Sequence, residues 1–253
     1  MIENSQGTIG IDFGGTGTKA AVVDVNAGTL VTDRHRIPTP HPATPQSMVP
    51  VMAELVAMCG SSADVGVTVP AVVQGGTVRS AANIDPEWIG VDAAQFFTEG
   101  LGQRVTVIND ADAAGLAEVR HGAGVGRDGV VLLLTLGTGI GSALFVDGNL
   151  VPNTEFGHLE LAGKDAEKYA AGSIRSSKDL SWKKWGKRVN KYLQLVEKLM
   201  SPELIIIGGG VSKKSDKYFK YFEVDAEVVP AVLKNGAGIV GAAMAAHENR
   251  LSA

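Results

Sequence analysis

The chain has 253 residues, of which 45% are hydrophobic and 20% are charged, and its formal net charge is −4. This length allows one large or two medium domains, and the slight acidity argues against a nucleic-acid-binding protein. Cys59 is the single cysteine, which excludes an internal disulfide and a cysteine-cluster metal site. The first residues are polar and no apolar run reaches the length of a membrane helix, so we expect a cytoplasmic protein that acts on small molecules.

The segment from Thr8 to Asp24 predicts a β-hairpin with a glycine-rich tip. Short apolar runs lie on both sides of Gly14 and Gly15, a pattern that favours two strands over a strand followed by a helix. Backbone N–H groups at a glycine turn point toward an anion, and threonine hydroxyls add donors. The segment therefore predicts a phosphate-binding loop, and Asp12 is placed to hold Mg²⁺ through water.

The same pattern returns in residues 131–148. Thr135 aligns with Asp12 and Asp147 with Asp24, a constant offset of 123 residues without gaps. Any strand–glycine–strand hairpin would share the glycines, but these matches extend beyond them. Two copies of a phosphate hairpin in successive lobes resemble the actin-like (ribonuclease H-like) ATPase fold of sugar kinases. We therefore expect a two-lobed α/β fold of this kind with its active site in the cleft between the lobes.

Between the hairpins, strands alternate with helices. We expect strands at 30–37, 64–69 and 103–108, a helix at 47–59, and a glycine hairpin at 75–76. Asp110 follows the last of these strands where a helix begins, and open α/β sheets place ligands at that edge.

After the second hairpin we expect helices at 164–172, 180–200 and 237–248, and strands at 203–207 and 227–233. The last helix is expected to return to the first lobe, an inference from the fold. The predicted lobes are residues 1–112 with 237–253, and residues 113–236.

Several familiar motifs do not fit their context. The glycines of 124–129 and 236–241 match the dinucleotide fingerprint, but the first set precedes a strand and the second lacks a following strand with its ribose-binding acid. Lys19 is not part of a Walker loop. The pairs Glu118/His121 and Glu155/His158 have di-iron spacing, but the four long helices of such a bundle are absent from the pattern.

Taken in order, a set of motifs resembles the ROK family of sugar kinases, and within it the polyphosphate glucokinase subgroup (polyphosphate/ATP glucomannokinase type). The motifs are DFGGTGTK, VTVPAVV, AANI, NDADAAGLAE, TLGTGIGSALF, EFGHLEL, AEKYAAG and IIIGGGVS, and they span essentially the whole chain. The resemblance implies a Mg²⁺-dependent phosphotransferase that phosphorylates glucose, with mannose a second candidate acceptor, from polyphosphate or ATP. Many relatives have a cysteine-rich zinc motif after the Gly-His pair; here it is missing, so no zinc is expected.

The resemblance also assigns residues. Asp110 corresponds to the acid that removes the proton from the sugar hydroxyl; the alternative is that Asp110 only caps the following helix. The implied sugar ligands are Asn83, Asn109, Asp110, Glu155, His158 and Glu167, with Glu160 a competitor of Glu167 because the alignment there crosses a deletion. The implied donor contacts are Asp12, Gly14, Gly15, Thr16, Thr18, Lys19, Gly137, Thr138, Gly139, Gly209 and Gly210.

Residues 175–191 hold seven basic residues against one acid. Lys183, Lys187 and Lys191 fall on one stripe of a predicted helix, and like charges so placed repel each other. Lys213, Lys214 and Lys217 form a second basic cluster after the glycines of 208–210. We interpret the stripe and this cluster as a path for polyphosphate; the alternative is an ordinary solvated helix face. The residues of the stripe are Lys183, Lys184, Lys187, Arg188 and Lys191.

Two other functions compete with a hexose kinase. A kinase for an N-acetylated amino sugar would differ in residues at the sugar 2-position, which the sequence does not place. A sugar-responsive regulator of the same family would have a helix-turn-helix domain before the first hairpin, which already begins at Thr8. The oligomeric state, monomer or homodimer, stays open.

Overall fold

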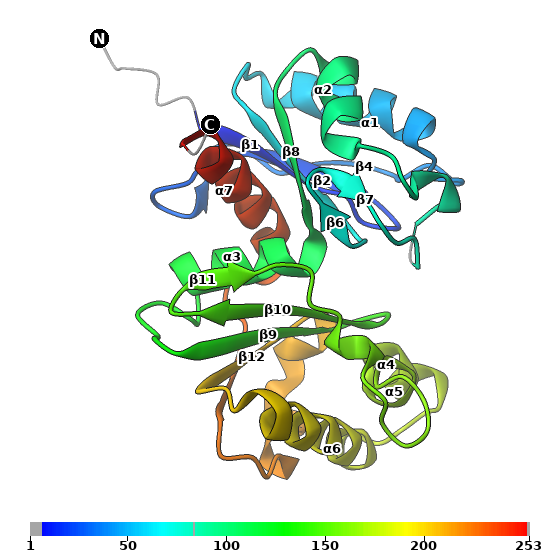
Figure 1. The fold of residues 1–253 in the computed structure, drawn as a ribbon, viewed down its shortest axis with the longest axis vertical. Coiled ribbons are helices and arrows are strands. Elements are labelled where there is room, and N and C mark those ends of the chain that lie inside the picture. The colour runs from blue at the N-terminus through cyan, green and yellow to red at the C-terminus, as the bar shows by residue number, and fades with distance from the viewer. Residues whose placement is uncertain (1–6, 83, 252–253) are drawn as a thin grey trace. The chain divides into compact units, whose positions relative to one another are not determined.

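The structure, a computed structural model, describes residues 7–82 and 84–251. The chain divides into two compact units, which are described separately (Figure 1). Unit 1 comprises Met1–Ala117 and Asn235–Ala253, and unit 2 comprises Glu118–Lys234.

Unit 1 is built on a sheet with the strand order β3-β2-β1-β5-β8, in which β4 also pairs with β2. β1 and β2 form an antiparallel hairpin, whereas β5 and β8 run parallel to β1. β5 is buried along its whole length, as expected for a parallel strand covered on both faces. The strands are β1 (Thr8–Asp12), β2 (Thr18–Asp24), β3 (Thr29–Leu30), β4 (His35–Ile37), β5 (Val65–Val69) and β8 (Val105–Asn109), with a separate small hairpin of β6 (Val73–Gln74) and β7 (Thr77–Val78).

Unit 2 repeats this topology in the order β11-β10-β9-β12-β13. β9 and β10 form the antiparallel hairpin, β11 pairs with β10, and β12 and β13 run parallel to β9. The structure therefore confirms both predicted hairpins and shows the same strand order around each. The strands are β9 (Val130–Leu136), β10 (Ile140–Val146), β11 (Asn149–Val151), β12 (Leu204–Gly208) and β13 (Glu227–Pro230).

The helices follow the apolar periodicity of the sequence. In α1 the Thr44 side chain caps the first turn by accepting from Ser47 N–H, and Gly60 ends the helix at a φ of 62°. The α-helices are α1 (Pro45–Cys59), α2 (Ala93–Leu101), α3 (Asp110–His121), α4 (Glu167–Ala170), α5 (Gly172–Ser177), α6 (Trp182–Met200) and α7 (Ala237–Leu251). Short 3₁₀ helices are η1 (Pro86–Trp88), η2 (Phe156–His158), η3 (Gly210–Lys217), η4 (Phe219–Tyr221) and η5 (Lys234–Gly236).

Two predicted elements are divided in the structure. The strand expected at 30–37 is interrupted between β3 and β4, because the Thr32 hydroxyl accepts the Val22 N–H there at 3.0 Å. The helix expected at 164–172 breaks at Ala171, whose ψ of 157° is not helical, and α5 begins after it. α2 was not predicted.

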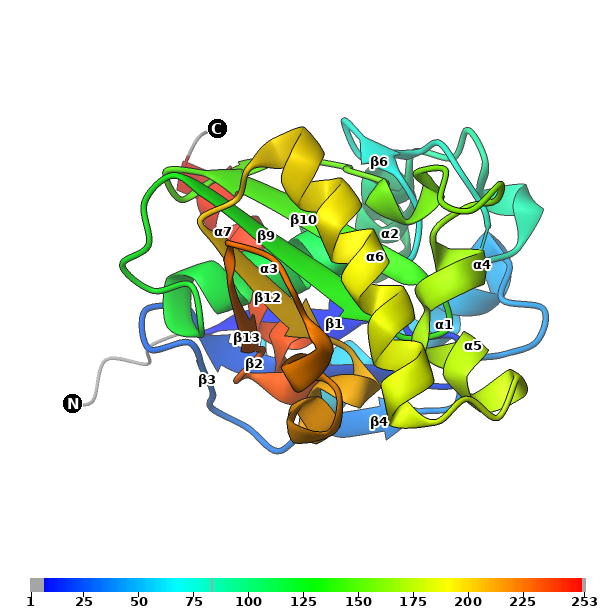
Figure 2. The ribbon, with the colours of Figure 1, turned by 90° about the horizontal axis from the view of Figure 1, so that it is seen from below.

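In unit 2, α6 covers one side of the hydrophobic core (Figure 2). Trp185, Val189 and Tyr192 are buried on its inner face, whereas Lys183 and Lys187 are exposed. This helix is therefore amphipathic, with its basic residues toward solvent. Within the described residues, no helix combines the length and the apolar composition needed to cross a membrane.

In unit 1, two glycines allow α7 to lie directly on the sheet. A Cβ at Gly10 in β1 would overlap the carbonyl oxygen of Ile239, and one at Gly66 in β5 would overlap that of Ala242. Backbone oxygens of a helix cannot move aside as a flexible side chain can, so these strand positions tolerate no side chain.

We predict that Gly66→Ala lowers the free energy of unfolding by about 3 kcal/mol, because the added methyl group forces α7 off the sheet. Gly236→Ala is the matched control, since a Cβ there meets no atom within 4 Å. Denaturant unfolding of the two variants checks this. Equal stability of the two would contradict the packing described.

Candidate active site

The loop between β1 and β2 exposes its tip to solvent. Gly15 and Thr16 are exposed, and a Cβ at Gly15 would meet no atom within 4 Å. Arg36 donates to the Thr16 carbonyl at 2.9 Å, and Thr39 donates to the Gly14 carbonyl. These two contacts hold the loop through its carbonyl groups, and Gly17 N–H also donates to the Gly14 carbonyl at 3.3 Å. Exposed glycine–threonine tips of this kind suit anion binding.

Thr18 differs from its predicted role as a donor contact. Its side chain is fully buried, and its hydroxyl lies 3.0 Å from that of Thr39. Thr18 therefore supports the loop, and Thr16 is the threonine exposed at the tip.

Asp12 and Lys19 face each other across the hairpin. They are register partners, and Lys19 Nζ lies 2.8 Å from Asp12 Oδ2. The other carboxylate oxygen has a long contact of 3.4 Å with the Thr68 hydroxyl. Since Mg²⁺ keeps most of its water ligands and needs only one or two carboxylates, Asp12 Oδ1 fits a water-mediated Mg²⁺ site.

Asn109 and Asp110 lie at the carboxyl end of β8, where α3 begins. Asn109 is buried; its side-chain oxygen accepts from the N–H groups of Ala111 and Asp112 at 2.8 and 3.1 Å, and its nitrogen donates to the Ala71 carbonyl at 3.0 Å. Asn109 is thus the N-cap of α3. Asp110 is exposed and accepts from Ala111 N–H at 2.8 Å. Since Asn109 already caps α3, the need for a helix cap does not explain why residue 110 is an aspartate.

The loop between β9 and β10 is the second glycine tip. Gly137 and Thr138 are exposed, and a Cβ at Gly137 would meet no atom within 4 Å. The loop is held through Ser173, whose N–H donates to the Gly137 carbonyl at 2.9 Å and whose hydroxyl donates to the Thr138 carbonyl at 2.6 Å.

Gly209 and Gly210 differ in their surroundings. Gly209, at a φ of 80°, packs against the backbone of Leu136, whereas a Cβ at Gly210 would meet no atom within 4 Å. Gly210 is therefore the more open of the two predicted donor contacts.

Three of the implied sugar residues gather beside the second loop. His158 lies within 3.7 Å of Glu155, and Glu167 Oε2 accepts from Ile140 N–H at 3.4 Å. A Cβ at Gly139 would overlap the Glu167 carboxylate, so this glycine makes room for it. Glu160 is exposed and is the β-bridge partner of Asp165, so the choice between Glu160 and Glu167 as sugar ligand stays a prediction.

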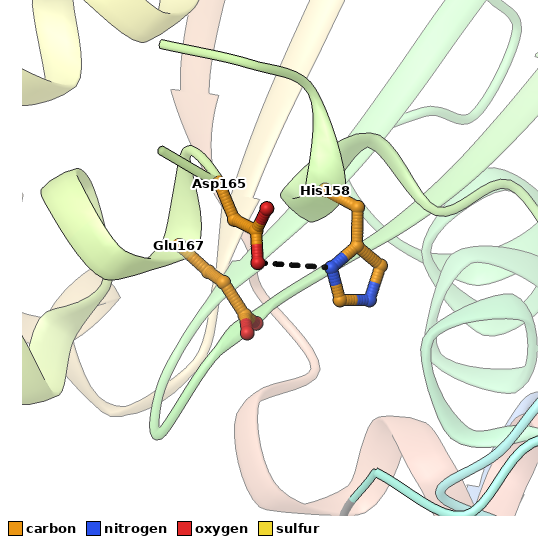
Figure 3. A group of neighbouring side chains, drawn as sticks. All are labelled: His158, Asp165 and Glu167. Carbon is orange, nitrogen blue, oxygen red and sulfur yellow. Dashed lines mark ion pairs between the residues drawn. The ribbon is translucent and has the colours of Figure 1, made fainter. Parts of the chain in front are cut away.

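Asp165 lies beside His158 and Glu167, a position that the sequence analysis did not predict (Figure 3). Its Oδ2 lies 3.7 Å from His158 Nδ1 and 2.7 Å from Lys168 Nζ. A two-residue turn at Ala162 and Gly163, both with positive φ as in type I′ hairpins, returns the chain to His158. The turn lies where many relatives of the resembled family have their zinc motif. The Asp-x-x-Lys spacing was the only available signal.

Burial and neighbouring charges both shift the pKa values in this group. Burial raises the pKa of Glu155 above 4.5; the His158 imidazole lowers it, and the Glu167 carboxylate raises it. The hydrogen bond from Lys168 lowers the pKa of Asp165. Glu155 and Glu167 are hydroxyl acceptors in their ionised form, and His158 offers a ring nitrogen, so the group suits a polyol.

The same group has metal-ligand spacing. His158, Asp165 and Glu167 each offer a ligand atom within 4.8 Å of the others. Lys168 already bonds to Asp165 Oδ2, as Lys19 does to Asp12 Oδ2, so the spacing alone does not assign a metal to this group. The predicted absence of zinc remains a prediction.

The remaining predicted site residues are Asn83 and the basic stripe on α6. Asn83 lies outside the described residues. Of the basic stripe on α6, the lysines are exposed, but Arg188 is half-buried and donates to the Tyr169 carbonyl at 3.3 Å. Arg188 also lies over the Tyr169 ring at 4.9 Å, so it has a packing role within unit 2.

Comparison with known proteins places this arrangement among sugar kinases. The model of the ROK family matches residues 8–172. The chain is 52% identical to the polyphosphate glucokinase of Mycobacterium tuberculosis, over 93% of this chain and 89% of that protein.

Solved structures give the same result. The inorganic polyphosphate/ATP-glucomannokinase of Arthrobacter is 49% identical, with a TM-score of 0.91 over 97% of this chain and 99% of that one. A ROK family glucokinase of Streptomyces griseus, in complex with glucose and AMPPNP, is 27% identical, with a TM-score of 0.82 over 95% and 99%.

We predict that Glu167→Gln lowers the pKa of Glu155, because it removes a nearby negative charge, but leaves it above 4.5, because burial persists. With a raised folded-state pKa, this group's contribution to stability is fully present at low pH and is lost as the pH rises through that pKa. Carboxyl ¹³C NMR titration measures the pKa. A Glu155 that titrates at or below 4.5 in the unaltered protein would contradict the assignment.

Proposed function

The chain belongs to the ROK family, and we propose that it transfers a phosphoryl group from inorganic polyphosphate or ATP to the 6-hydroxyl of glucose. The family match and the structural likeness confirm the family and the two-lobed α/β sugar-kinase fold predicted from the sequence. Mannose is a second acceptor, by similarity to the glucomannokinase. The chain is an enzyme of the polyphosphate glucokinase type.

The observation that supports this most is the repeated glycine hairpin. Each unit presents one exposed glycine–threonine tip at the same position of a sheet with the same strand order. Phosphoryl transfer requires positioning and charge stabilisation of the donor more than covalent chemistry by the protein. Two loops rich in outward N–H groups meet that requirement for a donor with several phosphates.

Asp110 acts as the general base. Its carboxylate takes the proton of the glucose 6-hydroxyl while that oxygen attacks the terminal phosphorus of the donor, and the donor leaves as ADP or as polyphosphate shortened by one phosphate. Asn109 holds the start of α3 and thereby fixes the backbone that bears Asp110. A base of this kind contributes roughly 10²–10⁴ in rate.

Sugar hydroxyls are bound by Glu155, His158 and Glu167. Asp165 positions the His158 imidazole, because its carboxylate faces Nδ1 and leaves Nε2 directed to the Glu155 side. Lys168 holds Asp165 in turn. Because Asp165 fixes the His158 ring through Nδ1, Nε2 is the ring nitrogen that can contact the substrate.

Donor phosphates are bound by the loop residues Gly15, Thr16, Gly137 and Thr138, with Lys19 as a counter-charge. Asp12 would hold Mg²⁺ through water, and the ion, when bound, neutralises charge on the donor phosphates. The exposed lysines of α6 (Lys183, Lys184, Lys187 and Lys191) attract the rest of a long polyphosphate.

A donor and acceptor comparison on the purified protein tests the function. We expect glucose 6-phosphate from both polyphosphate and ATP, measured by a coupled dehydrogenase assay. No product from either donor would contradict the proposal. Faster turnover of N-acetylglucosamine or N-acetylmannosamine than of glucose would favour the amino sugar kinase instead.

We predict that Asp110→Asn lowers kcat at least about 10²-fold and changes glucose affinity little, because the amide keeps the shape but cannot take the proton. Steady-state kinetics and glucose titration by calorimetry measure the two effects. Asp128→Asn, at an exposed acid, is the control and keeps normal turnover. Near-normal kcat in Asp110→Asn would remove Asp110 from its role.

A further inference from the structure

Two cations from different elements converge on the ring of Trp182 at the start of α6. The Arg175 guanidinium of α5 lies 3.9 Å from the ring centroid, and the Lys217 ammonium at the end of η3 lies 5.9 Å from it. Figures 1 and 2 both show α5 beside the first turns of α6. We call Arg175, Trp182 and Lys217 the tryptophan clamp.

The ring that holds the clamp is fixed by a buried aromatic cluster. Trp182 stacks on Tyr218 at 5.7 Å with an interplanar angle of 15°, and it meets Trp185 edge to face at 5.8 Å. Tyr218 and Trp185 are fully buried. Because the cluster sets the position of the indole, it also sets where the two cations can lie.

The positive charge of the clamp is not neutralised within the described part of the chain. Neither Arg175 nor Lys217 forms an ion pair with a described residue, and Arg175 Nε is buried without a hydrogen-bond partner there. Contact with an aromatic face compensates a cation only in part. A buried donor without a partner opposes folding, and two cations around one ring raise the positive potential there, so an anion that reaches either cation is stabilised.

Both cations are on segments that begin at the donor loops of unit 2. α5 starts beside Ser173, which is hydrogen-bonded to the Gly137 and Thr138 carbonyls. η3 starts at Gly210, directly after β12, and a Cβ at Gly172 would contact Val211 of η3 at 3.2 Å. The clamp therefore lies a short distance along the chain from the residues that bind the donor.

We propose that the tryptophan clamp binds phosphates of inorganic polyphosphate beyond the one transferred, and so favours this donor over ATP. The inference rests on the proposed function. A polyphosphate continues as a line of anionic groups where ATP ends in a nucleoside, so only polyphosphate extends the negative charge. Further exposed cations on the same segments suit a long anion: Lys178, Lys183, Lys184, Lys213 and Lys214.

Arg175→Met and Lys217→Met test the clamp, singly and together. We expect each to raise the KM for long-chain polyphosphate about tenfold, the usual scale for a lost charge-assisted phosphate contact, with the KM for ATP nearly unchanged. Lys220→Met is the matched control, because Lys220 also lies over an aromatic ring, that of Tyr221 at 5.6 Å, but outside the clamp. It should change neither KM.

Tryptophan fluorescence gives a readout independent of turnover. Polyphosphate added without glucose should change the emission of the unaltered protein, and Trp182→Phe should lose most of that change while its ring still supports the two cations. An unchanged polyphosphate KM in both Met variants, or an equal rise in KM for both donors, would overturn the clamp and leave the kinase function intact. A protein that forms no glucose 6-phosphate from polyphosphate would instead contradict the proposed donor.

Discussion

The geometry of the two glycine hairpins is the constraint on which the rest of the structure depends. In each hairpin an antiparallel register fixes the loop: Asp12 is opposite Lys19 in one, and Leu136 is opposite Ile140 in the other. Strands parallel to the first hairpin strand bury most of it in the sheet, whereas the residues at the tip are exposed. A rigid loop of this kind needs little reorganisation when an anion binds, which is what electrostatic stabilisation of phosphoryl transfer requires.

The two hairpins share a strand order but differ in the side chains at and near their loops. Asp12 in unit 1 is replaced by Thr135 in unit 2, where the hydroxyl accepts Gly141 N–H at 3.2 Å. Unit 1 therefore has the acid suited to a cation and Asp110, the proposed base, whereas unit 2 has the proposed sugar-binding group beside its loop. The carboxylate of Glu167 lies against Gly139 and Ile140, so it connects the proposed sugar residues of unit 2 with the glycine loop between β9 and β10.

The sequence was sufficient for features that depend on local pattern. Both hairpins, α1 and the apolar face of α6 follow from periodicity, caps and glycine positions. Features that depend on a distant partner were not predictable. Thr18 is buried because Thr39, from a segment with no regular pattern, pairs with it, and the hydrogen bond from the Asn109 side-chain nitrogen to the Ala71 carbonyl depends on a residue 38 positions away. Asp165 meets His158, and Lys168 meets Asp165, through a turn whose conformation the sequence did not indicate.

Hydrogen exchange at the two loops is the measurement that tests the central claim most directly. The account predicts that a non-hydrolysable ATP analogue slows exchange of the backbone amides at 14–17 and also at 137–139, because the proposed function requires each loop to bind phosphates of the donor. Protection of one loop alone, with the other exchanging as in the free protein, would contradict it.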